Sequence, residues 1–154
     1  MIRQISHLQL ITDQPAALVG YYTEILGLSL AFTVDDDAAG GTFGWVIACG
    51  AQTFIEIFDR CGAGCVWGNS QDPLHHGNRY RHMALEVVDL PAFCQTLRQR
   101  GGTVSSVTMG RTGSWQAWVK DPDGNDIELL EYTPTCAWVR SAAAVVPPLG
   151  DAGS

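Results

Sequence analysis

The sequence predicts an α+β fold in which a βαβββ module occurs twice, the two modules forming one open, curved, mixed-sheet cup. The first observation is a weak internal repeat: residues 13–16 (DQPA) return as residues 89–92 (DLPA), and residues 55–57 (IEI) return as residues 127–129 (IEL). The second is the alternation of apolar and polar residues in several short segments, which is typical of strands. The third is an apolar stripe at helical spacing in each half. Repeats of this kind indicate duplicated supersecondary units.

The first module is expected over residues 3–58 and begins with a strand over residues 3–11. A helix over residues 14–26 follows, because Asp13 is a suitable N-cap and Pro15 suits a first helical turn. Gly27 is the predicted stop signal of this helix. The apolar stripe of the helix consists of Leu18, Tyr22, Ile25 and Leu26. Three further strands are expected over residues 29–35, 43–49 and 52–58.

The second module is expected over residues 80–133 and follows the same plan. Its helix over residues 90–100 has Asp89 as the N-cap, with Phe93 and Leu97 facing inward. A strong turn signal, Asp-Pro-Asp-Gly-Asn at residues 121–125, separates the last two strands. The strands of this module are expected over residues 80–87, 103–107, 114–120 and 126–132.

Two stretches fall outside the repeat. Residues 59–79 form a long, glycine-rich connector that could act as a lid over the cup. Residues 134–154 are rich in alanine, proline and glycine and are expected to form a flexible tail. Residues 1–133 are therefore predicted to be a single domain.

The composition excludes several classes of partner. A net charge of -7 and a pI of about 4.8 argue against nucleic acid or an anionic membrane. The chain lacks a long apolar run and its start lacks the apolar region of a secretory signal, so a cytoplasmic location is expected. In that compartment the five cysteines are expected to be free thiols.

Four ionisable residues lie inside apolar, strand-like segments, where a charge is costly unless a partner satisfies it. Strand alternation places all four on the face opposite the aliphatic residues that pack on the helices. If the two sheets curve into one cup, the four side chains converge on its floor and can bind one divalent metal ion. Zinc or nickel suits this nitrogen and oxygen donor set, with cobalt, iron and manganese as alternatives. The four residues are His7, Glu56, His82 and Glu128.

Other interpretations of these residues remain open. A single histidine in a strand is more often a hydrogen-bonded core residue than a ligand, and a single glutamate often forms a salt bridge. Glu86 shares the ligand face with His82 and is a rival ligand, whereas Glu131 should face the helix side. A second, weaker candidate metal site combines two cysteines with two adjacent histidines of the connector, Cys61, Cys65, His75 and His76.

Several segments around these residues resemble the vicinal oxygen chelate superfamily, which includes glyoxalase I, fosfomycin-resistance proteins, extradiol dioxygenases and methylmalonyl-CoA epimerase. The two most specific are YYTEILGL at residues 21–28 and DPDGNDIE at residues 121–128. Shorter matches are ISHL at residues 5–8, FIEI at residues 54–57 and YRHMALEV at residues 80–87. The resemblance covers nearly all of residues 3–133 and implies paired βαβββ modules around one metal ion.

Within the superfamily the ligand set differs between activities. Dioxygenases and fosfomycin enzymes use two histidines and one glutamate, which correspond to His7, His82 and Glu128. Bacterial-type glyoxalase I adds a glutamate at the place of Glu56, so the resemblance favours a glyoxalase-I-like site. Glyoxalase I often carries an arginine four residues after its first histidine, where it contacts glutathione, and this chain has Ile11 there.

The resemblance implies a metal-dependent lyase or isomerase that acts on a small substrate with vicinal oxygens, such as the hemithioacetal of methylglyoxal, through an enediolate. Glu128 is the expected general base, with Glu56 as its partner or alternate. Superfamily members commonly pair modules between chains, so a homodimer is expected, with the site in one chain or across two. The alternatives are a ring-cleaving dioxygenase and a non-catalytic drug- or metabolite-binding protein. The expected substrate contacts are Phe54, Phe58, Arg111 and Trp115.

Overall fold

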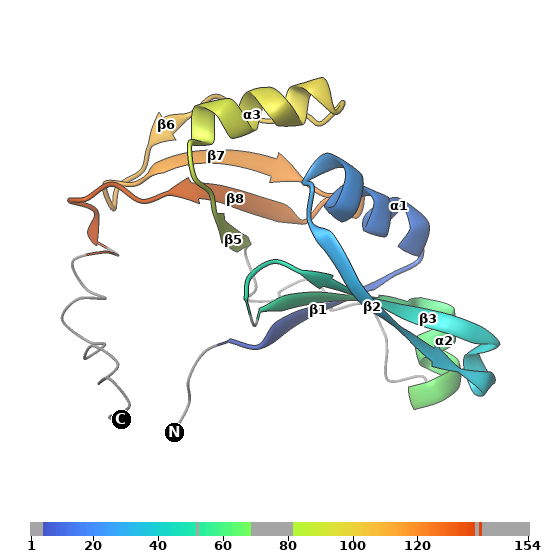
Figure 1. Cartoon of the computed structure of the whole chain (residues 1–154). Coiled ribbons are helices and arrows are strands. Elements are labelled where there is room, and N and C mark those ends of the chain that lie inside the picture. The colour runs from blue at the N-terminus through green and yellow to red at the C-terminus, as the bar shows by residue number, and fades with distance from the viewer. Residues whose placement is uncertain (1–4, 52, 69–81, 138, 140–154) are drawn as a thin grey trace, which may run out of the picture. The chain divides into compact units, whose positions relative to one another are not determined.

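The computed structural model describes residues 5–51, 53–68, 82–137 and 139 (Figure 1). Its chain divides into two compact units, each built on one four-stranded sheet. The first unit comprises Met1–His82 together with Lys120–Asp126, and the second comprises Met83–Val119 together with Ile127–Ser154. The unit boundary therefore departs from the boundary of the sequence repeat, because a short segment of the second repeat belongs to the first unit.

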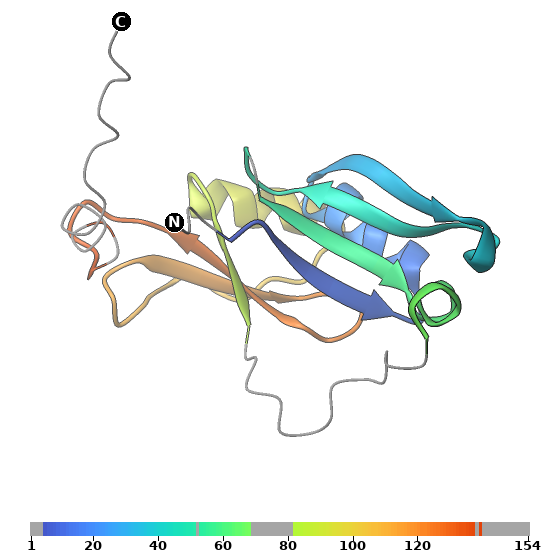
Figure 2. The ribbon, with the colours of Figure 1, turned by 90° about the horizontal axis from the view of Figure 1, so that it is seen from below.

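The first sheet has the strand order β1-β4-β3-β2, in which β1 and β4 run parallel and the other neighbours run antiparallel. Figure 2 shows β1 beside β4, with α2 following at the end of β4. The elements of this part of the chain are β1 (His7–Thr12), α1 (Pro15–Gly20), η1 (Tyr21–Ile25), β2 (Ser29–Asp36), η2 (Asp37–Ala39), β3 (Gly41–Ala48), β4 (Phe54–Asp59) and α2 (Arg60–Trp67).

The second sheet repeats this plan with the order β5-β8-β7-β6, and β5 runs parallel to β8. Its elements are β5 (Met83–Glu86), α3 (Leu90–Gln99), β6 (Thr108–Met109), β7 (Trp115–Lys120) and β8 (Asp126–Glu131). Both halves thus have the βαβββ order, and both sheets are open and mixed. The predicted α+β class with two such modules is confirmed.

One face of the first sheet is buried under the first helix. Ile55 and Ile57 of β4 are almost fully buried, as are Leu18 of α1 and Tyr22 of η1, and α1 packs against β4. The helix ends as predicted at Gly27, whose φ of 77° lies in the left-handed region that favours glycine. The aliphatic residues of β4 therefore face the helix, and the alternate residues face the other side of the sheet.

The second unit has a matching core on the α3 side of its sheet. Figure 1 shows α3 lying along one face of the sheet, and Ile127 and Leu129 of β8 are fully buried. Asp89 caps α3 as predicted, since its Oδ1 accepts a hydrogen bond from the Ala92 N–H at 3.2 Å. Phe93 is only partly buried, so the buried stripe of α3 is Leu90, Cys94 and Leu97.

Residues 59–79, expected as a glycine-rich connector, begin with a helix that the sequence did not predict, because Arg60–Trp67 form α2. Asp59 caps this helix: its Oδ2 accepts a hydrogen bond from the Gly62 N–H at 2.7 Å. Residues 69–79 lie outside the described residues, and so does the predicted lid. Most of the predicted tail, at residue 138 and residues 140–154, also lies outside them.

Two smaller predictions also differ from the structure. Asp13 does not cap α1, because the N-cap is Gln14 without a side-chain hydrogen bond, and Asp13 instead forms an ion pair with Arg60 at 2.8 Å. Residues 103–107 are not a strand, and β6 is the short segment Thr108–Met109. In this segment the Ser105 N–H still donates to the Trp118 carbonyl oxygen of β7 at 3.0 Å, and the Ser105 carbonyl oxygen accepts a hydrogen bond from the Arg98 guanidinium at 3.2 Å.

The turn at residues 121–125 forms as predicted and is organised by Asp121, which is 4% exposed. Its carboxylate accepts hydrogen bonds from the Asp123 and Asn125 backbone N–H groups at 3.0 and 2.9 Å. The hydroxyl of Tyr22 donates to the same carboxylate at 3.1 Å. Within the first unit, this turn is therefore fixed to η1.

Two bulk predictions can be compared with the structure. All five cysteines are free thiols, as expected: Cys94 and Cys136 are buried, Cys49 is partly buried, and Cys61 and Cys65 are exposed. Among the described residues, no helix is long and apolar enough to cross a lipid bilayer.

Candidate metal centre

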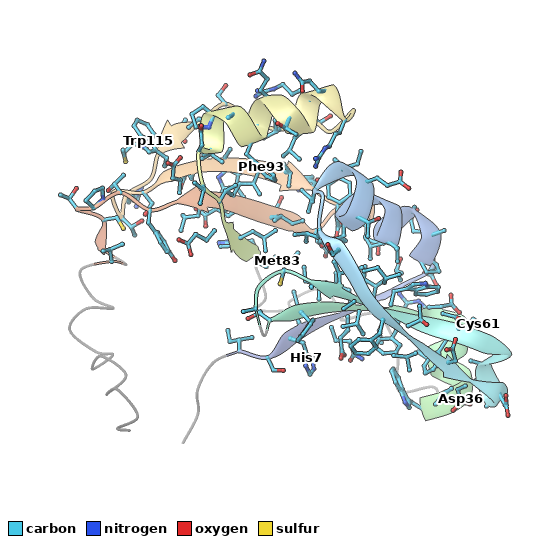
Figure 3. The ribbon with its side chains drawn as sticks, viewed as in Figure 1. His7, Asp36, Cys61, Met83, Phe93 and Trp115 are labelled. Carbon is cyan, nitrogen blue, oxygen red and sulfur yellow. The ribbon has the colours of Figure 1, made fainter. Side chains whose placement is uncertain are left out.

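His7 lies on the face of the first sheet that is turned away from α1 (Figure 3), and the strand register places Glu56 on the same face. In the parallel β1–β4 ladder, Glu56 lies opposite Gln9, so His7 is one diagonal step from Glu56 on the same face. The His7 Nε2 atom is 3.7 Å from the Glu56 Oε2 atom. Two of the four predicted ligands therefore lie side by side in the first unit.

The separation of these two atoms suits a shared cation. Two ligands that each bind one ion at about 2.1 Å lie roughly 3–3.5 Å from each other in octahedral or tetrahedral geometry. The observed 3.7 Å is close to this range and is longer than a hydrogen bond. The side chains are 49% and 23% exposed, so an ion can reach both donors.

His82 and Glu128 have the same register in the second repeat. Glu128 lies opposite Ala84 in the parallel β5–β8 ladder, and His82 directly precedes β5, two residues before Ala84. His7 stands two residues before Gln9, the partner of Glu56, so each half carries one histidine and one glutamate in equivalent places. Among residues 5–51, 53–68, 82–137 and 139, no three metal-binding side chains come together. The four-ligand site thus remains a prediction.

The face of the second sheet that carries Glu128 has a second carboxylate. Glu86 lies opposite Leu130 and has the strand parity of Ala84, which places it on the Glu128 face. Burial raises the pKa of Tyr132, and the carboxylates of Glu86 and Glu128 raise it further, as does Cys136. The carboxylates oppose ionisation of the phenol because they give this region a negative potential, which also favours a cation.

Glu131 lies on the helix side, as the strand pattern predicts. Its Oε2 atom accepts a hydrogen bond from the Leu90 N–H at 2.8 Å, at the start of α3. A carboxylate is favourable there because the first N–H groups of a helix lack partners within the helix. Glu131 therefore helps to fix α3 on the sheet and is not a rival ligand.

The four predicted substrate contacts differ in their surroundings. Phe54 is partly buried on the His7 face, opposite His7 in the ladder, whereas Phe58 is 4% exposed and packs with Phe43 and Ala63. Arg111 is exposed in the turn before β7. A direct contact of Phe58 with a substrate is therefore not favoured by its burial.

Trp115, the fourth predicted contact, is 42% exposed and lies opposite Met109 in the β6–β7 ladder (Figure 3). It has the strand parity of Ala117 and Val119, which are both buried. Trp118 has the other parity. Trp115 thus lies on the core side of β7, and its role as a substrate contact has no support from this position.

Two residues on or near the ligand face were not singled out from the sequence. Gln9 is exposed directly opposite Glu56, and strand parity with His7 could have found it. Trp67 ends α2 and packs on Phe58, which has the same strand parity as Glu56. Trp67 was not singled out because the two glycines within α2 disfavour a helix, so no helix was predicted there.

The weaker candidate site in the connector is only partly described. Cys61 and Cys65 are exposed and lie one turn apart on α2. His75 and His76 lie outside the described residues, so their approach to the thiols stays a prediction.

The profile of the Glyoxalase/Bleomycin resistance protein/Dioxygenase superfamily matches residues 4–129. The chain belongs to this superfamily. Its match spans both βαβββ modules and all four predicted ligands.

Individual superfamily members give a finer comparison. The chain is 29% identical over 134 residues to the lactoylglutathione lyase of Haemophilus influenzae, which covers 86% of this chain and 95% of the relative. It is 30% identical over 115 residues to the lactoylglutathione lyase of Salmonella typhimurium, covering 73% and 81% respectively. A solved structure, the antibiotic-binding protein TnmS3 from Streptomyces sp. CB03234, is 25% identical with a TM-score of 0.64 and covers 86% of this chain and 98% of that chain.

Proposed function

We propose that the chain is a metal-dependent lyase or isomerase of the glyoxalase I type, acting on a small substrate with adjacent oxygens. The hemithioacetal of methylglyoxal is the first candidate substrate. The observation that carries the proposal is the pair of His7 and Glu56, because a two-histidine, one-glutamate centre does not require a carboxylate at Glu56. The relatives named lactoylglutathione lyase support the same reaction class.

The four predicted ligands fit a divalent cation such as zinc or nickel, with cobalt, iron or manganese as alternatives. His7 and Glu56 supply donors from one strand pair, and His82 and Glu128 would supply donors from the equivalent strand pair. When bound, such an ion polarises a carbonyl group and acidifies the adjacent C–H bond. Imidazole nitrogen and carboxylate oxygen, without thiolate, match these ions.

The chain's own part in the reaction is to move one proton. We assign Glu128 as the base that removes the proton from the hydroxyl-bearing carbon of the substrate, with Glu56 as its partner or alternate. The same proton then returns to the neighbouring carbon, so that the substrate is isomerised without net loss or gain of atoms. A carboxylate suits this role because it is a proton acceptor that can return the proton in the next step.

The proposal is tested by metal analysis of the purified protein, followed by turnover of methylglyoxal with and without glutathione. Activity that depends on both a stoichiometric divalent metal and glutathione supports the lactoylglutathione lyase reaction. Activity without glutathione supports a related substrate, which Ile11 favours because it replaces the arginine expected to contact glutathione. Protein without bound metal would contradict the proposal.

The base is tested by the Glu128→Gln variant, which should abolish turnover while weakening metal binding only partly. Glutamine keeps an oxygen donor but cannot accept the substrate proton at neutral pH. Full activity in this variant would remove Glu128 from the role.

A second candidate function is the capture of a small molecule without catalysis. The likeness to the antibiotic-binding protein TnmS3 favours it. This function predicts ligand binding that needs neither a metal nor Glu128. Binding that survives both metal removal and the Glu128→Gln substitution would therefore support it over a lyase.

We further propose a cytoplasmic homodimer, whose site lies within one chain or across two. Mixing a His7→Ala variant with the Glu128→Gln variant distinguishes these arrangements. If each site draws one ligand pair from each chain, the mixed dimer contains one intact site and regains activity. If each site lies within one chain, both sites of the mixed dimer stay defective.

A further inference from the structure

The ligand face of the first sheet continues into an aromatic cluster. Phe58 follows Glu56 by two residues in β4, and the ladder to β1 is regular, so both side chains leave the sheet on the same side. Two residues along a strand span about 7 Å. The aromatic cluster therefore begins one strand step from the Glu56 carboxylate.

The Phe58 ring is held in place by the lack of a side chain at Gly44. Gly44 lies opposite Phe58 in the β3–β4 ladder, and a Cβ atom there would come within 2.4 Å of the ring. Phe43 packs against the same ring with a centroid separation of 5.3 Å. Phe58 is consequently a fixed support rather than a mobile side chain.

Trp67 packs on this support and remains open to solvent. Its ring centroid lies 4.8 Å from that of Phe58 and 5.5 Å from that of Phe43, both in edge-on arrangements. The residue is nevertheless 43% exposed. An indole that is held by two rings and still exposed can contact a ligand at little cost in conformational entropy.

We propose that Trp67 is a specificity-determining residue that selects substrates whose vicinal oxygens carry an aryl or other flat apolar substituent. This inference rests on the proposed function, because the ion bound at His7 and Glu56 fixes the oxygen end of the substrate. The apolar substituent then lies against the exposed surface of Trp67. A substituent as small as methyl cannot reach this surface from the metal-bound end and gains little from it.

Two hydroxamates test the inference without turnover. Acetohydroxamate and benzohydroxamate both chelate a metal through adjacent oxygens, but the first carries a methyl group and the second a phenyl group. Calorimetry on the metal-loaded full chain gives the ratio of their dissociation constants, and the same ratio is measured for the free ion. Protein binding should favour benzohydroxamate about five- to tenfold beyond the free-ion ratio, as expected for contact of a phenyl group with an indole.

Substitutions assign the preference to one residue. Trp67→Leu should reduce the preference to near the free-ion ratio, and Trp67→Phe should retain most of it. Trp115→Leu is the matched comparison, since Trp115 has a similar exposed fraction of 42% but lies in the second unit. Melting temperatures show which variants are folded. The comparison of the wild-type protein with the free ion does not depend on any variant.

The outcomes separate this inference from the proposed function. Binding of both hydroxamates with no excess preference for benzohydroxamate would overturn the role of Trp67 while leaving the metal centre intact. A preference lost in Trp115→Leu but kept in Trp67→Leu would also overturn it. If neither hydroxamate binds the metal-treated protein, the metal centre fails and the inference fails with it.

Discussion

The Nε2 atom of His7 and the Oε2 atom of Glu56 approach to 3.7 Å across two parallel strands, too far for a hydrogen bond and close enough to share one cation. A centre of two histidines and one glutamate does not require a carboxylate at the position of Glu56. Its substitution is the most direct test of the ligand set.

We expect Glu56→Gln to weaken metal binding by roughly 10–100-fold, since even residues that only orient a ligand have effects of this size. Glu86→Gln is the matched control, because Glu86 is an exposed carboxylate on the Glu128 face. Metal titration of both variants provides the measurement. Loss of the metal in Glu86→Gln together with unchanged metal binding in Glu56→Gln would show that the ligand was assigned to the wrong glutamate.

Two glycines of α2 should respond oppositely to alanine. A Cβ atom at Gly62 would lie 2.5 Å from the Phe43 Cβ, whereas nothing lies within 4 Å of one at Gly64. Gly62→Ala should lower the free energy of unfolding by about 1–3 kcal/mol through overpacking. Gly64→Ala should raise it by about 0.5–1 kcal/mol, because alanine loses less backbone entropy in a helix.

Denaturant titration of both variants gives these free energies. A loss of stability in Gly64→Ala equal to that in Gly62→Ala would mean that α2 does not pack against the sheet through Gly62.

The five thiols should differ in their rates of alkylation in the native protein. Cys61 and Cys65 are exposed on α2 and should react first, whereas buried Cys94 and Cys136 should be protected. Cys49 should react slowly, because burial raises its pKa and the thiolate is the reactive form. Peptide mass spectrometry after timed labelling identifies each site. Early labelling of Cys94 would contradict the packing of α3 on its sheet.

Alkaline pH should destabilise the protein through Tyr21. Burial and the nearby Asp121 carboxylate raise the Tyr21 pKa from 10.0 to about 12. The folded state thus favours the neutral phenol, and this contribution is complete below pH 10 and is lost as the pH rises towards 12. The melting temperature of Tyr21→Phe should fall less steeply over this interval than that of the wild-type protein. Parallel curves would show that Tyr21 titrates normally.

The strand pattern of the sequence predicted which face each candidate ligand occupies. Alternation separates Glu56 from its buried neighbours Ile55 and Ile57, and the structure has this arrangement. Such a pattern is local, because each side chain needs only its own strand to set its direction. The predicted grouping of four ligands would depend on how distant segments, or two chains, assemble, and no local pattern encodes such an assembly.

Helix α2 shows why one element could not be predicted. Its sequence, RCGAGCVW, contains two glycines, which normally disfavour a helix. Tertiary packing reverses this preference at Gly62, where the absence of a side chain lets the helix approach Phe43 closely. The cap at Asp59 was the available signal, but Asp59 directly follows the strand expected over residues 52–58 and was assigned to the connector.

The segment Lys120–Asp126 belongs to the first compact unit although it lies deep within the second repeat. Through it, Asp121 provides the acceptor for the Tyr22 hydroxyl, and the Asp123 carboxylate accepts a hydrogen bond from the Gln14 side chain at 2.6 Å. The first unit is therefore completed by residues of the second repeat, and cutting the chain between the repeats would remove the Asp121 acceptor from the Tyr22 hydroxyl.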